Sequence, residues 1–288
     1  MRLWARAGLA VSIPGIVALL AWGAYEEFSA NPNDVDPQAI APRMLHDAAE
    51  TSEYLKAFPV DAYKVAEVDG QGRFHVDDLD DVIKRPLRKG VMWEPYLVNL
   101  MPRHVRPGTT AIDVGAHIGV HTVTLARAAG RKGRVYAFEP QKKLHRELVH
   151  NLKLNGLGNV VALRFALGDA PSILEMSRSA KNNEGGTAIG VGGDRVELRT
   201  LDSFGFRNVS FIKIDVEGYE DHVLAGAAQT IRAQHPTILV EIQGGNDYDK
   251  ASADVRQKID ATVAKLKSFG YAVRRVSMHD YLATYGAP

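Results

Sequence analysis

Residues 110–119 are Thr-Ala-Ile-Asp-Val-Gly-Ala-His-Ile-Gly, and this stretch decides the fold. An apolar run, Thr110–Val114, stops at a glycine turn, and helical spacing begins directly after it at Val120. Glycine lets the backbone turn sharply and come close to a ligand. A strand, a glycine turn and a helix in this order are typical of the first unit of a doubly wound sheet, whose ligands bind at the carboxyl ends of the strands.

The same alternation continues to residue 276. We expect strands at Thr110–Val114, Arg134–Phe138, Val160–Phe165, Val209–Ile214, Thr237–Ile242 and Tyr271–Val276. We expect helices at Val120–Ala129, Lys142–Leu154, Glu220–Gln234 and Ser252–Phe269. Strands that alternate with amphipathic helices form a parallel sheet covered on both faces. The predicted fold class is therefore α/β, with a Rossmann-like sheet flanked by helices.

The helical period is lost between Ala166 and Thr200. Ser172–Ser177 and Arg195–Arg199 are predicted to be extended, on either side of a glycine-rich loop, Gly185–Gly193. Two roles stay open for this loop, which either covers a site or is a long surface turn.

Composition narrows the possible partners and chemistry. The 288 residues are 45% hydrophobic and 24% charged, which is typical of a folded globular protein. The formal net charge is +1, so the chain lacks the broad positive field that duplex binding needs, and we expect no nucleic-acid partner. The absence of Cys excludes disulfides, thiolate metal sites and cysteine nucleophiles.

The N-terminus differs from the rest of the chain. Ala7–Tyr25 is a run of 19 residues without a charge, and as a helix it would span roughly 28 Å, close to the thickness of a bilayer core. We predict that residues 1–30 form a membrane anchor, with a cleaved signal peptide and a buried core helix as alternatives.

Three regions follow from these patterns. After the anchor, residues 31–92 are predicted to be a linker and a small extension, with an amphipathic helix at Met44–Phe58 and a hairpin around Asp69-Gly70-Gln71-Gly72. Residues 93–288 then form the main domain.

Two acids at the ends of the first two strands indicate the ligand. Glu139 follows the second strand and is placed to accept hydrogen bonds from both hydroxyls of a ribose. A dinucleotide site favours G-x-G-x-x-G without an acid before its first glycine, whereas Asp113 here precedes Gly115. An acid is unfavourable beside a pyrophosphate but suits a cationic group, such as the amino group of S-adenosylmethionine. We therefore expect S-adenosylmethionine as the cofactor.

A longer set of motifs runs in a fixed order. It comprises Asp113–Gly119, Phe138-Glu139-Pro140, Asn151–Asn155, Ala166-Leu167-Gly168-Asp169, Thr200-Leu201-Asp202-Ser203, Ile212–Glu220 (I-K-I-D-V-E-G-Y-E), Val223–Ala227 and Pro236–Glu241. This set resembles the FkbM family of S-adenosylmethionine-dependent methyltransferases, from about Trp93 to Glu241. It departs from the family at His117, where Asn is common. The last antiparallel strand is either incomplete or formed by Asp280–Thr284.

The resemblance implies a class I methyltransferase fold and transfer of a methyl group to a hydroxyl on a sugar, glycolipid or secondary metabolite. The expected cofactor-binding residues are Asp113, Gly115, Ala116, Gly119, Glu139, Leu167 and Asp169. The candidate catalytic carboxylates are Asp215, Glu217 and Glu241. An idle, membrane-anchored module that only binds the adenosyl group is the alternative function.

We expect no bound metal. Two alternatives stay open, a clamp formed by His117 and His121 and a divalent site on Asp215, Glu217 and Glu220.

Two considerations about topology conflict. Arg2 and Arg6 precede the apolar run, so the positive-inside rule places the main domain outside the cytoplasm. The methyl donor, however, is made and held in the cytosol. We predict a membrane-associated enzyme with a single anchor at residues 7–25, its domain on the cytoplasmic side, near a membrane-borne acceptor such as a lipid-linked sugar.

Overall fold

The computed structural model describes residues 60–177, 183–186, 190, 192–242, 248 and 251–286. The predicted anchor and the helix expected at Met44–Phe58 lie outside these residues. Within the described ranges, none of the helices is both long and apolar enough to cross a membrane.

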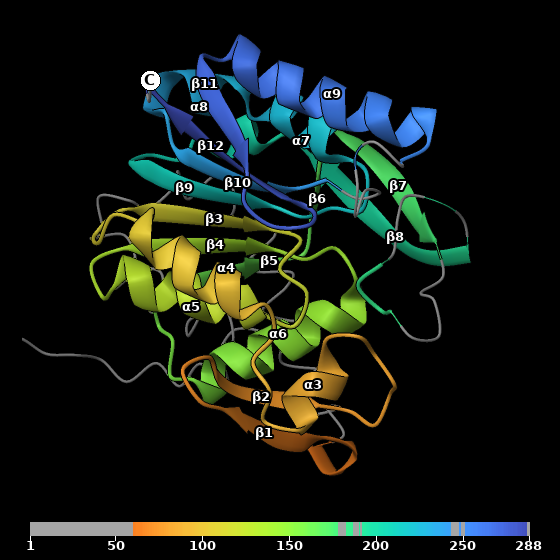
Figure 1. Cartoon of the computed structure of the whole chain (residues 1–288). Coiled ribbons are helices and arrows are strands. Elements are labelled where there is room, and N and C mark those ends of the chain that lie inside the picture. The colour runs from red at the N-terminus through yellow and green to blue at the C-terminus, as the bar shows by residue number, and fades with distance from the viewer. Residues whose placement is uncertain are drawn as a thin grey trace, which may run out of the picture.

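A seven-stranded mixed sheet forms the centre of the molecule (Figure 1). Its strands are β3 (Thr110–Val114), β4 (Arg134–Phe138), β5 (Val160–Leu163), β9 (Val209–Ile214), β10 (Thr237–Glu241), β11 (Tyr271–Arg275) and β12 (Asp280–Tyr285). They lie in the order β11-β12-β10-β9-β3-β4-β5, and β12 alone runs antiparallel to both of its neighbours. The sheet and the helices that cover it confirm the predicted α/β fold class. The order reverses between β3 and β9, which places the ligand crevice at their carboxyl ends.

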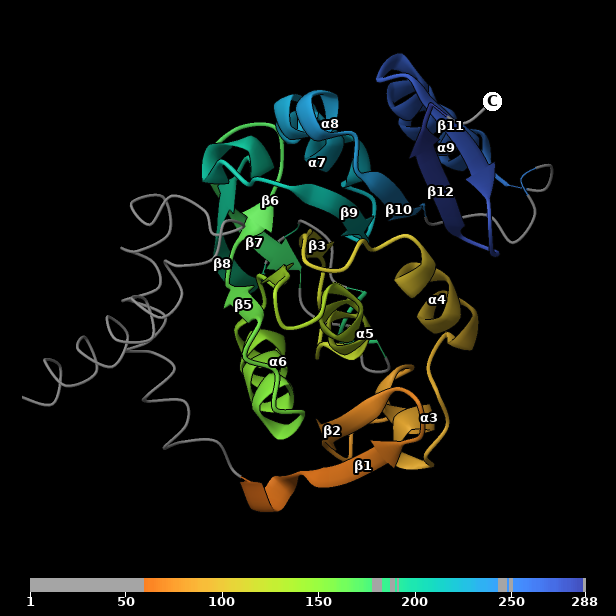
Figure 2. The same ribbon diagram turned by 90° about the vertical axis from the view of Figure 1, so that its left-hand side faces the viewer.

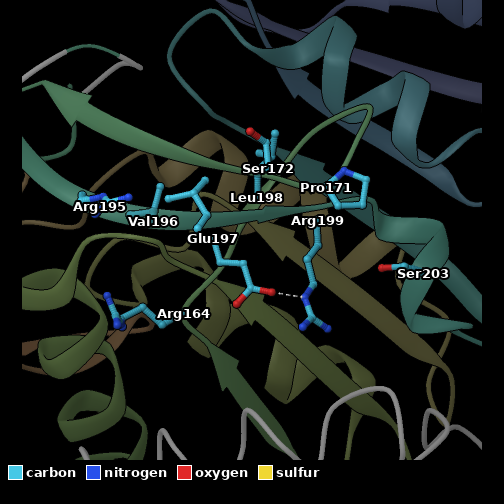
Figure 3. A pocket seen from close by; sticks show the side chains of 10 residues that line it. Arg164, Pro171, Ser172, Arg195, Val196, Glu197, Leu198, Arg199 and Ser203 are labelled. Carbon is cyan, nitrogen blue, oxygen red and sulfur yellow. Dashed lines mark hydrogen bonds and ion pairs between the residues drawn. The ribbon is translucent and has the colours of Figure 1, made fainter.

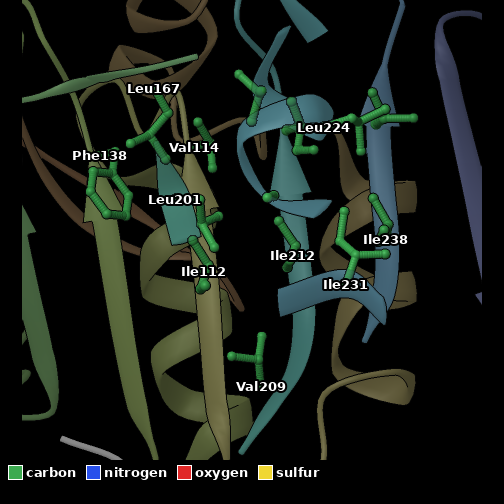
Figure 4. Close-up of a cluster of buried hydrophobic side chains, with 14 of the residues drawn as sticks. Ile112, Val114, Phe138, Leu167, Leu201, Val209, Ile212, Leu224, Ile231 and Ile238 are labelled. Carbon is green, nitrogen blue, oxygen red and sulfur yellow. The ribbon is translucent and has the colours of Figure 1, made fainter. Parts of the chain in front are cut away.

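Alternate residues of the strands build a core on each face of the sheet. On one face, Ile112, Ile212 and Ile238 pack against α7 (Glu220–Gly226), α8 (Ala228–Gln234) and α9 (Ala253–Ser268), as Figure 4 shows for part of this cluster. On the other face, Phe211 and Leu239 pack against α4 (Pro95–Leu100) and α5 (Val120–Ala129). Because both faces are covered, the strand sequences are almost continuously apolar.

The single helix predicted at Glu220–Gln234 is wrong, because the chain forms α7 and α8 with a break at Ala227. The Asp202 carboxylate, from the 3₁₀ helix η3 (Leu201–Phe204), accepts hydrogen bonds from the backbone amides of Gln229 and Thr230. Asp202 therefore caps α8 from outside the helix. Beside the break, Gly226 packs so closely on Gly168 that a Cβ would stand 1.9 Å from the Gly168 carbonyl oxygen.

The N-terminal extension packs against the helices below the sheet (Figure 2). After η1 (Val60–Ala62), it forms the predicted hairpin from β1 (Lys64–Val68) and β2 (Gly72–Val76), followed by α3 (Lys84–Arg88). Phe74 and Leu87 share one apolar cluster with Val123 of α5 and Leu144 of α6 (Lys142–Leu154). A short 3₁₀ helix, η2 (Met101–Arg103), extends α4.

A small second sheet lies beside the carboxyl ends of the strands. Its order is β6-β8-β7, formed by β6 (Ala166–Leu167), β8 (Gly192–Arg199) and β7 (Ser172–Ser177). Both predicted extended segments are confirmed as β7 and β8, and the predicted last antiparallel strand is β12.

Candidate active site

A pocket opens where β3, β4 and β9 end. Its lining residues are Val114, Gly115, Phe138, Glu139, Pro140, Gln141, Phe165, Ala166, Leu167, Met176, Gly185, Leu198, Asp215, Val216, Glu217 and Tyr219. Five of the residues singled out from the sequence are among them: Gly115, Glu139, Leu167, Asp215 and Glu217. Asp113, Ala116, Gly119, Asp169 and Glu241 do not line this pocket, and their roles stay predictions.

Glu139 is the buried carboxylate of the pocket, with 4% of its surface exposed. Its Oε2 accepts a hydrogen bond from the His117 amide at 2.8 Å, and its Oε1 accepts one from the Gln141 amide at 2.9 Å. Burial nevertheless raises the pKa of Glu139 to about 7. A carboxylate has about four acceptor positions, so two are left for hydroxyl donors from a ligand.

The glycine turn after β3 is hydrogen-bonded to the end of β4. Gly115 has a φ of 81°, and Gly119, which begins α5, has a φ of 91°. The amides of Gly115 and Ala116 both donate to the Phe138 carbonyl. A backbone turn of this kind leaves room for a ligand next to the strand end.

Asp113 lies beneath the turn, fully buried, and faces α5 rather than the pocket. Its Oδ2 accepts from Thr122 Oγ1 at 2.6 Å, and Oδ1 makes no hydrogen bond with any residue that the structure describes. Burial raises the pKa of Asp113, although Lys213 Nζ lies 3.9 Å from Oδ1.

Lys213 is a buried cation shared by two of the predicted site carboxylates. Its Nζ donates to Asp215 Oδ2 at 3.0 Å, and only 5% of its side chain is exposed. Burial by itself would raise the pKa of Asp215, but Lys213 holds that pKa below its usual value. Asp215 is therefore ionised at neutral pH.

Further carboxyls gather beside Lys213 on the same edge of the sheet. Asp280, the first residue of β12, stands opposite Glu241 at the end of β10 in the antiparallel register of the two strands. Burial and the negative charge of Asp215 raise the pKa of Glu241 to about 9, so it is protonated at neutral pH. Glu94, which precedes α4, has its pKa raised to about 7 by burial and by Asp280.

Two further predicted residues, Leu167 and Asp169, come from β6 and the turn after it. Leu167 is buried in the pocket wall. Asp169 Oδ2 is 3.0 Å from His222 Nδ1, and the His222 ring stacks on Tyr219 with centroids 4.1 Å apart. Tyr219 thus joins Asp169 to the pocket wall.

Sequence reasoning gave no role to Lys213, Glu94, Asp280 or Tyr219. The sequence did contain a signal for Lys213. Residues two apart on a strand share a face, so Lys213 is expected on the same side as Asp215. Glu94 and Asp280 reach the site through contacts between distant segments, for which the sequence carries no local signal.

Part of the glycine-rich loop lies against the pocket. Gly185 lines it, and the Glu184 amide donates to Asp81 Oδ2 at 2.9 Å. Gln141 donates to the Glu184 carbonyl at 3.1 Å. Among the described residues of this loop, these contacts favour the role of a cover over the site.

Three carboxylates, Asp77, Glu147 and Glu184, lie close enough to share a metal ion. Two ammonium groups already occupy the space between them and offset two of their three charges. Lys84 Nζ lies 2.9 Å from Glu147 Oε2 and 3.1 Å from Asp77 Oδ2, and it pairs with Glu184. Lys143 pairs with the same three carboxylates. We term these five residues the Lys84 cluster, which ties the loop to the N-terminal extension and to α6.

A second hollow lies on the opposite face of β8 (Figure 3). Arg195, Glu197 and Arg199 alternate along the strand and project into it, together with Arg164 from the end of β5. Glu197 Oε1 accepts from Arg199 Nε at 2.7 Å. This hollow is basic, and within the described residues it shares Leu198 alone with the pocket at the ends of β3, β4 and β9.

Residues 113–273, more than half of the chain, match the family described as Methyltransferase FkbM domain. Among solved structures, the chain is similar to methyltransferase FkbM from Methylobacillus flagellatus KT, with 17% identity and a TM-score of 0.46 over 94% of this chain and 60% of that one. The chain thus spans 60% of the length of that protein.

Two other solved structures are similar to the chain. A SAM dependent methyltransferase from Aquifex aeolicus has 15% identity and a TM-score of 0.37, covering 67% of this chain and 88% of its own. Aeropyrum pernix fibrillarin with bound S-adenosyl-L-methionine has 11% identity and a TM-score of 0.40, covering 77% and 93%. The curated proteins include no match.

Proposed function

Because the chain belongs to the FkbM family of S-adenosylmethionine-dependent methyltransferases, we propose that it methylates a hydroxyl oxygen on a sugar, glycolipid or secondary-metabolite acceptor. The observation that carries this proposal is the pair of acids after β9. Asp215 and Glu217 border the same pocket as Glu139, which supports a role for these carboxylates beside the methyl donor. Carboxylates can orient an alcohol and accept its proton.

The lining of the pocket suits the donor. Glu139 keeps two acceptor positions for the ribose hydroxyls, and Leu167 and Tyr219 supply apolar walls for the adenine. Gly115 leaves the strand end open to the amino-acid part of the donor. When bound, S-adenosylmethionine supplies a methyl group on a positively charged sulfur that is already a good leaving group.

The residues around the acceptor work mainly by position. Since little chemical help is needed at the sulfur, alignment of the hydroxyl with the methyl carbon supplies most of the acceleration. Asp215 is ionised and held in one place by Lys213, which fits it to orient an acceptor hydroxyl. Transfer of the hydroxyl proton to a carboxylate would add about 10²–10⁴-fold.

One labelling experiment tests this function. The purified protein is incubated with methyl-labelled S-adenosylmethionine and an extract of the cells that produce it, and the labelled product is identified by mass spectrometry and NMR. We expect a methyl ether. A label on nitrogen or carbon would reject O-methylation, and donor binding by calorimetry without any labelled product would favour the idle binding module.

We also propose that residues 7–25 tether the enzyme to a membrane with its domain on the cytoplasmic side, where the donor is made. The uncharged run of 19 residues supports the tether. A tether would keep the domain near a lipid-linked acceptor. Protease is added to sealed right-side-out spheroplasts, and the domain should survive until lysis. Digestion of the domain without lysis would reverse the proposed topology.

A further inference from the structure

We propose that Glu94, oriented by His121, is the carboxylate that takes the proton of the acceptor hydroxyl. This inference rests on the proposed O-methylation and names a group for it outside the matched residues 113–273. It concerns a residue for which neither the motifs nor the comparisons give a role.

Glu94 is fixed in place by the N-terminal extension. It adopts a left-handed conformation, with φ 45° and ψ 60°, directly before Pro95 at the start of α4. The backbone of the preceding residue, Trp93, makes two hydrogen bonds with the side-chain amide of Gln71. Its carbonyl accepts from Gln71 Nε2 at 2.8 Å, and its amide donates to Gln71 Oε1 at 2.9 Å. Gln71 lies in the turn of the β1–β2 hairpin and is fully buried, so the hairpin positions Glu94.

His121 is the residue that faces Glu94 from α5. Its Nε2 lies 3.2 Å from Glu94 Oε2, and 8% of its side chain is exposed. Burial lowers the pKa of His121 to about 3, so the imidazole is neutral and can donate through Nε2–H to an ionised Glu94. The contact with His121 therefore holds the Glu94 carboxylate from the α5 side.

The other charged groups around Glu94 come from three strands. They are Lys213 and Asp215 of the β9 strand end, Glu241 of β10 and Asp280 of β12. Two of these carboxylates are poorly suited to take a proton. Lys213 keeps Asp215 ionised by lowering its pKa, so its affinity for a proton is low. Glu241 already carries a proton at neutral pH.

Glu94 has the properties that the other two lack. Its side chain is 32% exposed, so an acceptor can reach it. Its pKa of about 7 means that a large fraction is ionised at neutral pH and still binds a proton well. General bases work best when their pKa lies near the working pH.

The proposed methyl transfer conserves atoms and electrons. The acceptor oxygen forms a bond to the methyl carbon while the bond between that carbon and sulfur breaks, and the electron pair stays on sulfur. Glu94 takes the proton from the oxygen and becomes neutral. The products are a methyl ether, S-adenosylhomocysteine and a protonated Glu94, which loses its proton to solvent through its exposed edge.

The first test needs no acceptor. Protein labelled with ¹³C at the glutamate carboxyls is titrated by NMR in the presence of S-adenosylhomocysteine, and the Glu94 signal is assigned by its loss in Glu94→Gln. We expect a midpoint near 7. His121→Leu should move that midpoint upward, because the ionised form loses a donor. A midpoint near 4.5, the ordinary glutamate value, would overturn the inference whatever the acceptor is.

The second test uses the product identified in the labelling experiment. Glu94→Gln should lower turnover by about 10²-fold with unchanged S-adenosylmethionine affinity, and Glu94→Asp should restore part of it. Glu67→Gln, on an exposed residue of β1, is the matched control. The wild type should lose activity below pH 7. In His121→Leu, the midpoint of this loss should move to higher pH. Equal turnover of Glu94→Gln and wild type would reject Glu94 while leaving the methyltransferase function intact, whereas an inactive wild type would reject that function alone.

Discussion

Gly115 passes the backbone of Asp215 so closely that a Cβ on residue 115 would stand 1.7 Å from the Asp215 carbonyl oxygen. The glycine turn after β3 and the end of β9 are thus one packed unit. Neither strand end can move without the other, which explains why a glycine is required here for space as well as for its φ of 81°.

We expect Gly115→Ala to destabilise the protein by about 3 kcal/mol or more, from overpacking of about 1–3 kcal/mol and a left-handed backbone cost of about 1–2 kcal/mol. Gly108→Ala is the control, because Gly108 has the same φ of 81° and nothing within 4 Å of the new Cβ. Thermal and denaturant unfolding measure the stability loss of each variant. Equal losses in the two variants would mean that the contact with Asp215 is not limiting.

Donor binding should depend on pH through Glu139. The carboxylate must be ionised to accept two ribose hydrogen bonds, and its pKa in the free protein is about 7. Affinity for S-adenosylmethionine should therefore fall as the pH drops below 7, by up to about tenfold per unit. Isothermal titration calorimetry between pH 5.5 and 8 tests this. An affinity that does not change over this range would contradict the ribose assignment.

Glu139→Ala should weaken donor binding by roughly 2–4 kcal/mol, since each charge-assisted hydrogen bond is worth about 1.5–3 kcal/mol and the two are not fully additive. The variant must remain folded, which far-UV circular dichroism verifies. Glu67→Ala serves as the control and should bind the donor as the wild type does.

Asp215→Asn should reduce turnover at least tenfold and leave donor affinity nearly unchanged, because the amide keeps the shape but loses the charge that orients the acceptor. Initial rates with the identified acceptor, together with calorimetry, separate the two effects. Full activity in this variant would transfer the role to Glu217 or Glu241.

Lys213→Met should destabilise the fold by about 3–5 kcal/mol, because it leaves Asp113 and Asp215 buried without their cation. The folded-state pKa of both carboxyls would then rise above the unfolded values. The folded protein would bind more protons than the unfolded chain, so the loss of stability should be largest at pH 7–8 and shrink towards pH 5. Urea unfolding at several pH values measures this. A loss independent of pH would show that the two carboxylates are not responsible.

Lys84→Met should lower stability by about 3–5 kcal/mol and weaken donor binding, since Lys84 is fully buried among three carboxylates that hold the loop at Gly185. Lys64→Met, which removes an exposed ion pair with Asp78, should change little. Because two ammonium groups already pair with the three carboxylates of the Lys84 cluster, a chelator should leave the melting temperature unchanged. A drop in melting temperature with chelator would point to a bound metal instead.

The strands that carry the site could be predicted because they are buried on both faces. β3, β4 and β9 coincide with the predicted ranges, since a parallel strand in this position is a short apolar run bounded by turns. The glycine turn and Glu139 follow from the same pattern. The break between α7 and α8 could not be predicted, because its cause is a cap from Asp202, about 27 residues earlier in the chain.

The positions of Glu94 and Asp280 were harder to predict from the sequence. Glu94 reaches the strand ends because Gln71 in a hairpin turn holds the neighbouring Trp93, and the predicted boundary between residues 92 and 93 falls between these partners. Local periodicity contains no information about such a contact. Asp280 reaches the same place because β12 runs backwards through the sheet and begins where its neighbours end.

The direction of β12 also determines where a reporter group can be attached. The strand starts at the reactive edge with Asp280 and carries the chain to the far edge, where Tyr285 stacks on His235 at the end of α8 (Figure 1). A dye or an immobilisation handle joined beyond Gly286 would therefore stand on the side of the sheet away from the crevice. Surface-coupled binding measurements made through this end would leave the pocket at the ends of β3, β4 and β9 free.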